Sequence, residues 1–479
     1  MLKFRKTSVA ENAVLNTVKT VIGIVFPLLI YPYISRVLGA EQLGVYDFSH
    51  SIYSYVRLVS MLGISIYAVR EGSFLREDKE KIEEFANEVF SINIISTLIG
   101  YLLLFVILLS PAMGHYRITT MILCTEVLFF TVGAMWVFSI YEDYLYITLR
   151  SILVQCFSLV LIFLFVKTPA DVNKYAAVRM FAHSLSFMIG YFYICRRYCR
   201  IRFVWHMNWK KHLKPILIIF STTIAVSLYV NFDTTAIGLL LNDYQVGLYG
   251  MAVRLYIVIK DILTAVVIVL IPRFSILFSE GKKEEASKVL SRVLGILMML
   301  MLPMCMGVFI LSSEIVQIIA GAEFAGAAFP LRLMSCAIAF SIYSYTFIQC
   351  ILIPQKKEKI VFYTTLFSLA VNIVLDLLLI PVWGIAAAAV TTIIAEGITL
   401  LICLFHAKRS VHLYMDIRNI FSVLAGCIGI VAICLLCKKM STPVMRVALS
   451  VLFSVPAYFS MLYILKNDTL KDLYRLFRK

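Results

Sequence analysis

The chain has 479 residues, of which 61% are hydrophobic and only 15% are charged, and its mean hydropathy is +0.91. A soluble protein of this length needs more polar surface, so the composition excludes that class and predicts a polytopic membrane protein. The net charge of +16 does not indicate a nucleic-acid partner, because Lys and Arg collect in the cytoplasmic loops of membrane proteins.

Apolar runs of around 20 residues, each able to cross a hydrocarbon core about 30 Å thick, recur along the chain. They predict an all-α polytopic membrane fold with about 14 transmembrane helices. In chain order the expected spans are Asn12–Ser35, Gly44–Val69, Asn87–Leu109, Tyr116–Phe138, Tyr146–Val166, Val172–Cys195, Pro215–Leu241, Val246–Ile271, Val289–Leu311, Ala327–Ile351, Ile360–Ile380, Gly384–His406, Ile420–Cys437 and Val444–Leu465. Because the number is even and most cations fall in loops on the side of the N-terminus, we expect both termini to be cytoplasmic.

Two stretches that lie 203 residues apart indicate an internal repeat. "GVYDFSHSIYSYVRL" begins at Gly44 and "GLYGMAVRLYIVIKD" begins at Gly247. In each, a Tyr follows the Gly after nine residues and a cation follows the Tyr after four: these pairs are Tyr53 with Arg57 and Tyr256 with Lys260. Spans that repeat in the same orientation predict two six-helix lobes related by a pseudo-two-fold axis along the membrane normal.

The repeat also predicts the domain organisation. We expect an N-terminal six-helix lobe at residues 1–200 and a C-terminal six-helix lobe at residues 201–410. Residues 411–479 should form an additional helix pair and a basic cytoplasmic tail.

Charged residues inside the spans are candidate functional residues, because a charge near the bilayer centre costs several kcal/mol unless it faces water or a partner. Cations outnumber anions among them, and a cavity lined in this way would attract an anionic substrate. The candidates for a cationic substrate-binding cavity are Arg57, Lys260, Arg254 and Lys19. Lys19 also lies near enough to the end of its span to extend towards the cytoplasm.

Two acidic residues and two tyrosines complete the candidate site. Asp233 is either an ion-coupling site or a counter-ion for a nearby cation, and the sequence leaves both interpretations open. Glu396 lies in the middle of an alanine-rich span and is a candidate proton-coupled carboxylate. Tyr53 and Tyr256 can stack on sugar rings, although Tyr is also common at membrane interfaces.

Catalytic and metal-binding motifs are absent from the sequence. It contains no GxSxG, Walker A or HExxH motif and no metal-ligand pattern of paired cysteines. The 11 cysteines are scattered, and their odd number argues against a disulfide framework. We therefore expect a protein that is not an enzyme and that holds no cofactor or metal.

Three stretches resemble the bacterial polysaccharide-unit flippases. They are "PLLIYPYISRVLGAEQLGVYDFSHSIYSYVRLVSMLGISIYAVRE" at Pro27–Glu71, a later motif within Val308–Met334, and "NIVLDLLLIPVWGIAAAAVTTIIAE" at Asn372–Glu396. The chain is similar to the Wzx-type O-antigen and exopolysaccharide flippases of the multidrug/oligosaccharidyl-lipid/polysaccharide exporter superfamily.

This resemblance implies a function in the bacterial cytoplasmic (inner) membrane. It implies alternating-access translocation of an undecaprenyl-pyrophosphate-linked oligosaccharide repeat unit for O-antigen, capsule or exopolysaccharide, often coupled to an ion gradient. The implied partners are that lipid-linked oligosaccharide, membrane lipids, a polysaccharide polymerase and a chain-length regulator.

Three other functions remain open from the sequence. A multidrug or metabolite cation antiporter of the same superfamily would need an acidic cavity, whereas the excess here is basic. A peptidoglycan-precursor lipid flippase would share both the fold and the pyrophosphate chemistry. A membrane polymerase or ligase would carry a large extracytoplasmic loop, and the expected outside loops are short.

Overall fold

The computed structural model describes the backbone of residues 9–414 and 416–470, and the side chains of these residues apart from 9–21, 24 and 25. This described part consists of helices and short connections, without a strand. It divides into two compact units, Met1–Gly247 (unit 1) and Leu248–Lys479 (unit 2). The expected boundaries of the lobes and of the C-terminal pair stay a prediction.

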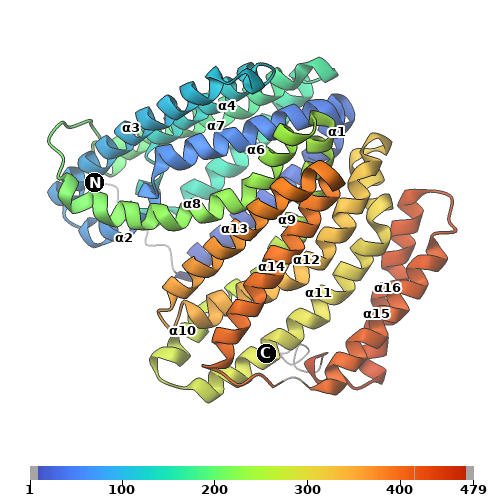
Figure 1. Cartoon of the computed structure of the whole chain (residues 1–479). Coiled ribbons are helices and arrows are strands. Elements are labelled where there is room, and N and C mark those ends of the chain that lie inside the picture. Colours follow the sequence, from blue (N-terminus) through green and yellow to red (C-terminus); the bar gives the residue numbers. More distant parts are fainter. Residues whose placement is uncertain (1–8, 415, 471–479) are drawn as a thin grey trace. The chain divides into compact units, whose positions relative to one another are not determined.

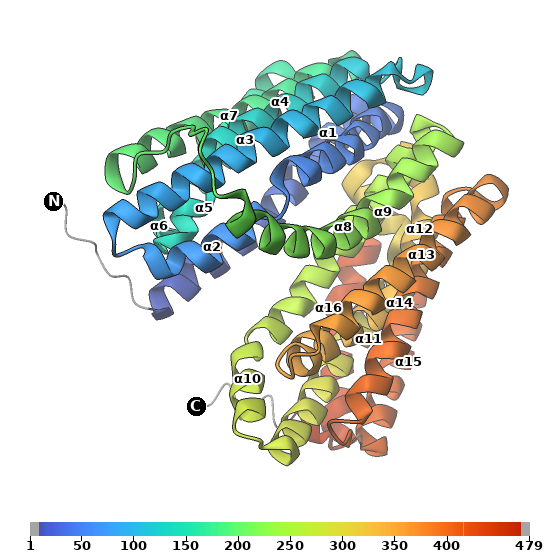
Figure 2. The same cartoon turned by 60° about the vertical axis from the view of Figure 1, so that its left-hand side comes forward.

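Unit 1 is built around its first helix (Figure 1). Helix α1 packs on α3, α4, α6 and α8, and α7 packs on α4 and α6, so that α3, α4 and α7 lie alongside α1 in both views (Figures 1 and 2). The helices are α1 (Val9–Met61), α2 (Ile64–Leu75), α3 (Lys79–Leu109), α4 (Arg117–Gly133), α5 (Trp136–Ile140), α6 (Tyr144–Phe165), α7 (Val172–Arg197) and α8 (Trp209–Leu240).

Left-handed backbone conformations set two of the helix breaks in unit 1. Gly39, with φ of 73°, kinks α1 and separates the first two expected spans, which are otherwise continuous. Ala134, with φ of 44°, ends α4, so the expected span Tyr116–Phe138 is two helices, α4 and α5. A right-handed helix cannot continue through a residue with positive φ.

Unit 2 is built from the remaining helices, α9 to α16. Helix α14 packs on α12 and α13, and α11 packs on α12, α15 and α16. The helices are α9 (Asp243–Ile268, whose first turn belongs to unit 1), α10 (Ile271–Ser279), α11 (Lys283–Ala320), α12 (Ala328–Phe347), α13 (Glu358–Trp383), α14 (Ile385–Lys408), α15 (Ile417–Cys437) and α16 (Pro443–Ile464). Short 3-10 helices lie at Pro111–Met113, Pro169–Asp171 and Ala322–Ala327, and a π-helical turn lies at Ile348–Leu352.

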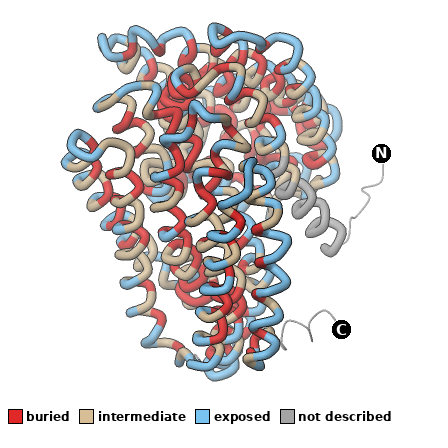
Figure 3. Tube along the Cα trace, turned by 90° about the vertical axis from the view of Figure 1, so that its right-hand side faces the viewer, coloured by how far each residue is buried: buried red, intermediate tan, exposed pale blue. Residues whose placement is uncertain are grey.

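The helices show the pattern of a protein that is solvated by lipid, as buried and exposed residues alternate along them (Figure 3). On α3, Leu98, Leu102, Phe105 and Leu109 follow one face and are each more than 60% exposed. Gly100 instead faces α1, where an added Cβ would overlap the Ser60 hydroxyl. Lipid tails are as apolar as leucine, so the hydrophobic effect does not drive helices together in a membrane. Small residues such as this glycine instead allow the helices to pack closely.

Eleven helical segments in the described part of the chain are long and apolar enough to cross a membrane, which makes this a multi-span membrane protein. The expected count of about 14 spans is not confirmed. The segment Phe26–Leu75 merges two expected spans, and the described helices α4 and α7 are not among the candidates. Helix α4 has only 17 residues, and α7 carries several charged side chains.

Candidate functional site

Unit 1 holds a cluster of charged and polar side chains around Glu126, on α4. The Tyr53 hydroxyl on α1 donates a hydrogen bond to Glu126 Oε1 at 3.2 Å. The His183 Nδ1 on α7 lies 3.2 Å from the same oxygen. Glu126 is only 8% exposed, so these partners replace the water that a carboxylate would otherwise need.

Two arginines belong to the same cluster. The Arg57 guanidinium lies 4.6 Å from the centre of the Phe130 ring, one turn after Glu126 on α4. Arg57 and Arg179 are both within electrostatic range of the Glu126 carboxylate. The Glu126 cluster, defined as Tyr53, Arg57, Glu126, Arg179 and His183, therefore has two fixed positive charges against one negative charge.

Unit 2 holds a smaller cluster around Glu396, on α14. The Lys260 ammonium and the Tyr256 hydroxyl on α9 each lie 3.4 Å from Glu396 Oε1. The ammonium also lies 5.5 Å from the centre of the Tyr256 ring. The Glu396 cluster, defined as Tyr256, Lys260 and Glu396, is electrically balanced.

The structure thus brings together two of the expected pairs. Arg57 joins Tyr53 in unit 1, and Lys260 joins Tyr256 in unit 2, because a spacing of four residues places two side chains on one helix face. Both tyrosine rings are buried, at 4% and 7% exposure, and their hydroxyls face carboxylates. Their expected role in stacking on sugars stays a prediction.

The glycines that begin the two repeated stretches have a structural explanation. In unit 1, a Cβ at Gly44 would overlap the main-chain carbonyl of Asp243, and a Cβ at Gly247 would overlap that of Ala40. The two contacts are reciprocal, since both pairs are related by the same shift of 203 residues. Only a residue without a side chain allows main chains to approach so closely.

The remaining expected residues lie elsewhere. Asp233 is buried on α8 in unit 1, within electrostatic range of Tyr55, whose hydroxyl is 2.9 Å from that of Thr235. Arg254 is half-buried on α9 in unit 2. Lys19 lies on α1, and its side chain is outside the described residues.

Sequence reasoning missed the acidic centre of the unit 1 cluster. Glu126 lies in the middle of an expected span, which is the same signal that identified Glu396. His183 stands in no motif that marks it as functional. A search for acids in every span would have found Glu126, whereas the contact between α4 and α7 that joins it to His183 is a tertiary feature.

A third polar cluster lies in unit 2 and consists of side chains with oxygen atoms between α13 and α14. The Thr391 hydroxyl donates a hydrogen bond to Asp376 Oδ1 at 2.5 Å and lies 3.3 Å from the Asn372 amide nitrogen. Asp376 is fully buried, and Asn372 is 2% exposed. Carboxylate, amide and hydroxyl oxygens are the ligands that hard cations prefer.

A further half-buried cation in unit 1 is Arg150, on α6. Its guanidinium lies 5.8 to 6.0 Å from the ring centres of Phe138, Tyr146 and Phe187. Such aromatic faces stabilise a cation through their negative quadrupole. Arg150 therefore does not extend freely to the interface.

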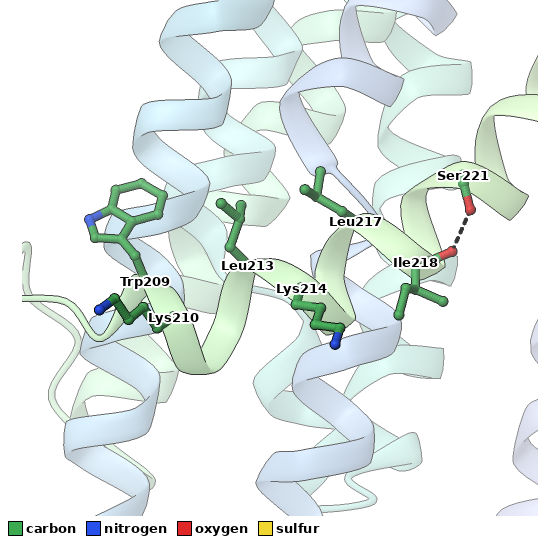
Figure 4. A pocket seen from close by; sticks show the side chains of 7 residues that line it. All are labelled: Trp209, Lys210, Leu213, Lys214, Leu217, Ile218 and Ser221. Atoms are coloured by element: carbon green, nitrogen blue, oxygen red, sulfur yellow. Dashed lines mark hydrogen bonds between the residues drawn. The ribbon is translucent and has the colours of Figure 1, made fainter.

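The first half of α8 presents an open pocket of about 560 Å³ whose seven lining residues all belong to that helix. Lys210 and Lys214 project from one side of α8 and Leu213 and Leu217 from the other (Figure 4). Opposite this pocket, the buried His212 is held by the Tyr67 hydroxyl at 2.7 Å and by Glu88 at 2.6 Å. The amphipathic start of α8 is thereby fixed to α2 and α3.

Unit 2 contains a second pocket, of about 340 Å³, between α11, α15 and α16. Its lining is almost entirely aliphatic, sulfur-containing and aromatic, as with Pro303, Met304 and Val308 from α11 and Val451 and Val455 from α16. A pocket of this composition accommodates hydrocarbon better than any polar group.

Comparisons with known proteins agree with this architecture. Residues 9–278 match the family model described as polysaccharide biosynthesis protein. A protein of Escherichia coli (strain K12) named as an O-antigen transporter is 23% identical over 305 residues, covering 61% of this chain and 69% of that protein. A protein of Haloferax volcanii named for a low-salt glycan biosynthesis flippase, Agl15, is 27% identical over 171 residues, covering 36% of each chain.

Solved structures show the same fold at low sequence identity. The lipid II flippase MurJ in an inward closed conformation has a TM-score of 0.74 and 15% identity, covering 96% of this chain and 99% of that chain. An inward-facing multidrug resistance MATE family transporter has a TM-score of 0.63 and 13% identity, covering 83% of this chain and 97% of that chain. The proteins in these comparisons are named as transporters and flippases, not as enzymes. Because the family model spans more than half of the sequence, this chain belongs to the polysaccharide biosynthesis protein family.

Proposed function

We propose that this protein is a flippase that moves an undecaprenyl-pyrophosphate-linked oligosaccharide repeat unit across the bacterial inner membrane by alternating access. The observation that carries the proposal is the positive excess of the Glu126 cluster, where Arg57 and Arg179 face one carboxylate inside a membrane protein. A diphosphate diester carries two negative charges, and moving them into a bilayer requires compensating cations. The names of the E. coli and H. volcanii relatives support the same substrate class.

The other parts of the substrate also have suitable surfaces in the chain. The apolar pocket between α11, α15 and α16 would hold part of the isoprenoid tail through hydrophobic contact. The lysines and tryptophan at the start of α8 fit a segment at a membrane interface rich in anionic lipid headgroups. We assign Arg57, Lys260, Arg254 and Lys19 to the cationic cavity, and Asp233 and Glu396 to ion coupling or charge compensation.

The experiment measures surface polysaccharide in a strain deleted for this gene. The strain is complemented with the wild type, with Arg57→Gln plus Lys260→Gln, or with Arg196→Gln, at matched membrane levels. Arg196 is an exposed cation at the end of α7 and serves as the matched control. We expect the wild type and the control to restore polysaccharide and the double variant not to do so.

Other outcomes distinguish the alternatives. If the double variant restores polysaccharide fully, the cations are not part of the transport path. If deletion changes only drug tolerance, the protein is a cation antiporter. If deletion causes lysis and loss of peptidoglycan, its substrate is the peptidoglycan precursor.

The remaining assignments belong to the same proposal. We place both termini in the cytoplasm, and we expect a polysaccharide polymerase and a chain-length regulator to act with the flippase. Reporter fusions to each terminus test the orientation, and co-purification from cross-linked membranes tests the partners.

A further inference from the structure

His183 is a partly exposed member of the Glu126 cluster. Its side chain is 37% exposed, whereas that of Glu126 is 11% exposed. The histidine lies one turn after Arg179 on α7, and its ring centre is 6.4 Å from that of Phe187. A ligand or a proton can therefore reach the imidazole without opening the packed contact between α4 and α7.

The contact with Glu126 determines which imidazole nitrogen carries the proton. An ionised carboxylate can only accept hydrogen bonds, so Nδ1, at 3.2 Å from Glu126 Oε1, is the N–H of the neutral ring. Nε2 is then a hydrogen-bond acceptor. Protonation converts Nε2 into a donor and adds a positive charge, which changes the group from one that repels an anion to one that binds it.

The charged groups around His183 act on the imidazole in opposite directions. Glu126 on α4 favours imidazolium, whereas Arg57 on α1 and Arg179 on α7 oppose it. The other titratable or charged groups that face the cluster are Tyr53 and His50 from α1, Tyr175 from α7 and, beyond Phe187, Arg150 from α6. An incoming anion would offset the two arginines and shift the balance towards the protonated ring.

We infer that His183 takes up a proton when the anionic headgroup binds to the Glu126 cluster, so that protons and substrate bind cooperatively. This inference rests on the proposed function. Because linkage is reciprocal, affinity for the anion falls as pH rises through the imidazole titration range. The fall is up to about tenfold per pH unit above that range, since one proton is involved.

The test uses the purified full chain in nanodiscs and a short-chain prenyl diphospho-N-acetylglucosamine as the probe. A diphosphate diester has no proton of its own that titrates near neutrality, so any pH dependence comes from the protein. We expect the wild-type Kd to rise between about pH 6 and pH 8, and the Kd of His183→Asn to change far less. Asparagine keeps an N–H donor for Glu126. His206→Asn, which changes an exposed histidine outside the cluster, is the matched control and should keep the wild-type slope.

A second measurement needs no variant. Adding the probe to wild-type protein in weakly buffered solution near neutral pH should remove a substantial fraction of one proton per bound ligand from the solution. Absence of proton uptake, or a wild-type slope in His183→Asn, overturns the inference while leaving the proposed function intact. Absence of probe binding at every pH overturns the proposed function itself, and the inference with it.

Discussion

The Glu126 cluster of unit 1 and the Glu396 cluster of unit 2 share a sequence element, a Tyr followed four residues later by a cation. They differ in the charged groups that surround this element. In both, a Tyr and a cation four residues later meet a buried carboxylate. The carboxylate comes from α4 in unit 1 but from α14 in unit 2, and these are not corresponding helices of the repeat. The comparison indicates that both halves of the repeat keep a cation near a carboxylate. The helix that supplies the carboxylate differs between the two halves.

The Glu126 cluster and the Glu396 cluster also differ in net charge. Unit 1 adds Arg179 and His183 around its single carboxylate, which leaves a positive excess for an anionic ligand. Unit 2 pairs Lys260 with Glu396, which leaves no excess. We therefore expect removal of a single cation to cost more stability in unit 2 than in unit 1.

The largest expected loss of stability follows from breaking the pair of Lys260 and Glu396. Lys260→Gln should lower the free energy of unfolding by roughly 3 kcal/mol, because it leaves Glu396 buried without its counter-ion. This is the low end for a broken buried pair, since the Lys260 side chain is 29% exposed. Arg57→Gln should cost only about 1 kcal/mol, mostly its contact with the Phe130 ring, because Arg179 and His183 still face Glu126.

Thermal stability of the variants in detergent, followed by the loss of monodisperse protein, measures this difference. Lys260→Gln combined with Glu396→Gln should recover most of the lost stability. Equal losses for the two single variants would show that the clusters are not different in this respect.

The next effect concerns the reciprocal glycines. Gly44→Ala and Gly247→Ala should each lower the free energy of unfolding by about 2 kcal/mol, since the new methyl group meets a main-chain carbonyl that cannot rotate away. Gly307→Ala is the control, because no atom lies within 4 Å of its Cβ position, and it should be neutral or slightly stabilising. A large difference between the two glycine variants would contradict the reciprocal contact.

A smaller and equal effect is expected from the two tyrosines. Tyr53→Phe and Tyr256→Phe each remove one hydrogen bond to a carboxylate while keeping the buried ring. Each should cost about 1 kcal/mol, measured in the same stability assay. Loss of transport with unchanged stability in only one variant would instead indicate a direct role of that hydroxyl in binding.

The smallest expected effect is the change in Tm on substituting the residues that precede the first turns of α3 and α11. Asp78 caps α3 by accepting the Lys81 main-chain N–H, whereas the corresponding Lys282 gives α11 no side-chain cap. Asp78→Ala should lower Tm by about 1–2 °C, and Lys282→Asp should raise it by a similar amount. Differential scanning fluorimetry measures both, and no change at Lys282→Asp would show that the cap does not form.

The same cap predicts a pH dependence. The Lys81 ammonium and main-chain N–H lower the pKa of the Asp78 carboxyl. A group whose folded pKa is lowered stabilises the protein above its ordinary pKa and loses that contribution as pH falls through the lowered value. The Tm difference between the wild type and Asp78→Ala should therefore shrink only in acid.

The sequence was sufficient for the fold class, for all three members of the Glu396 cluster and for two of the five members of the Glu126 cluster, Tyr53 and Arg57. Span length and low charge predicted an all-helical membrane protein because the bilayer requires long apolar helices with internally bonded main chains. The repeat identified Tyr53 with Arg57 and Tyr256 with Lys260, because residues four apart share a face of a helix. The same periodicity could not predict the break at Ala134, where an ordinary residue adopts a left-handed conformation.

Tertiary structure decided what each cation meets. Glu126 reaches Tyr53 through the packing of α4 on α1 and His183 through the packing of α4 on α7, and Glu396 reaches Lys260 from α14. Side-chain direction along one helix follows from the local sequence, whereas the choice of neighbouring helix depends on how all the faces of a unit pack together. The sequence by itself determined that two matched cations lie within apolar helices. Only the packing of those helices decided that Lys260 is balanced by Glu396, whereas Arg57 shares Glu126 with a second arginine.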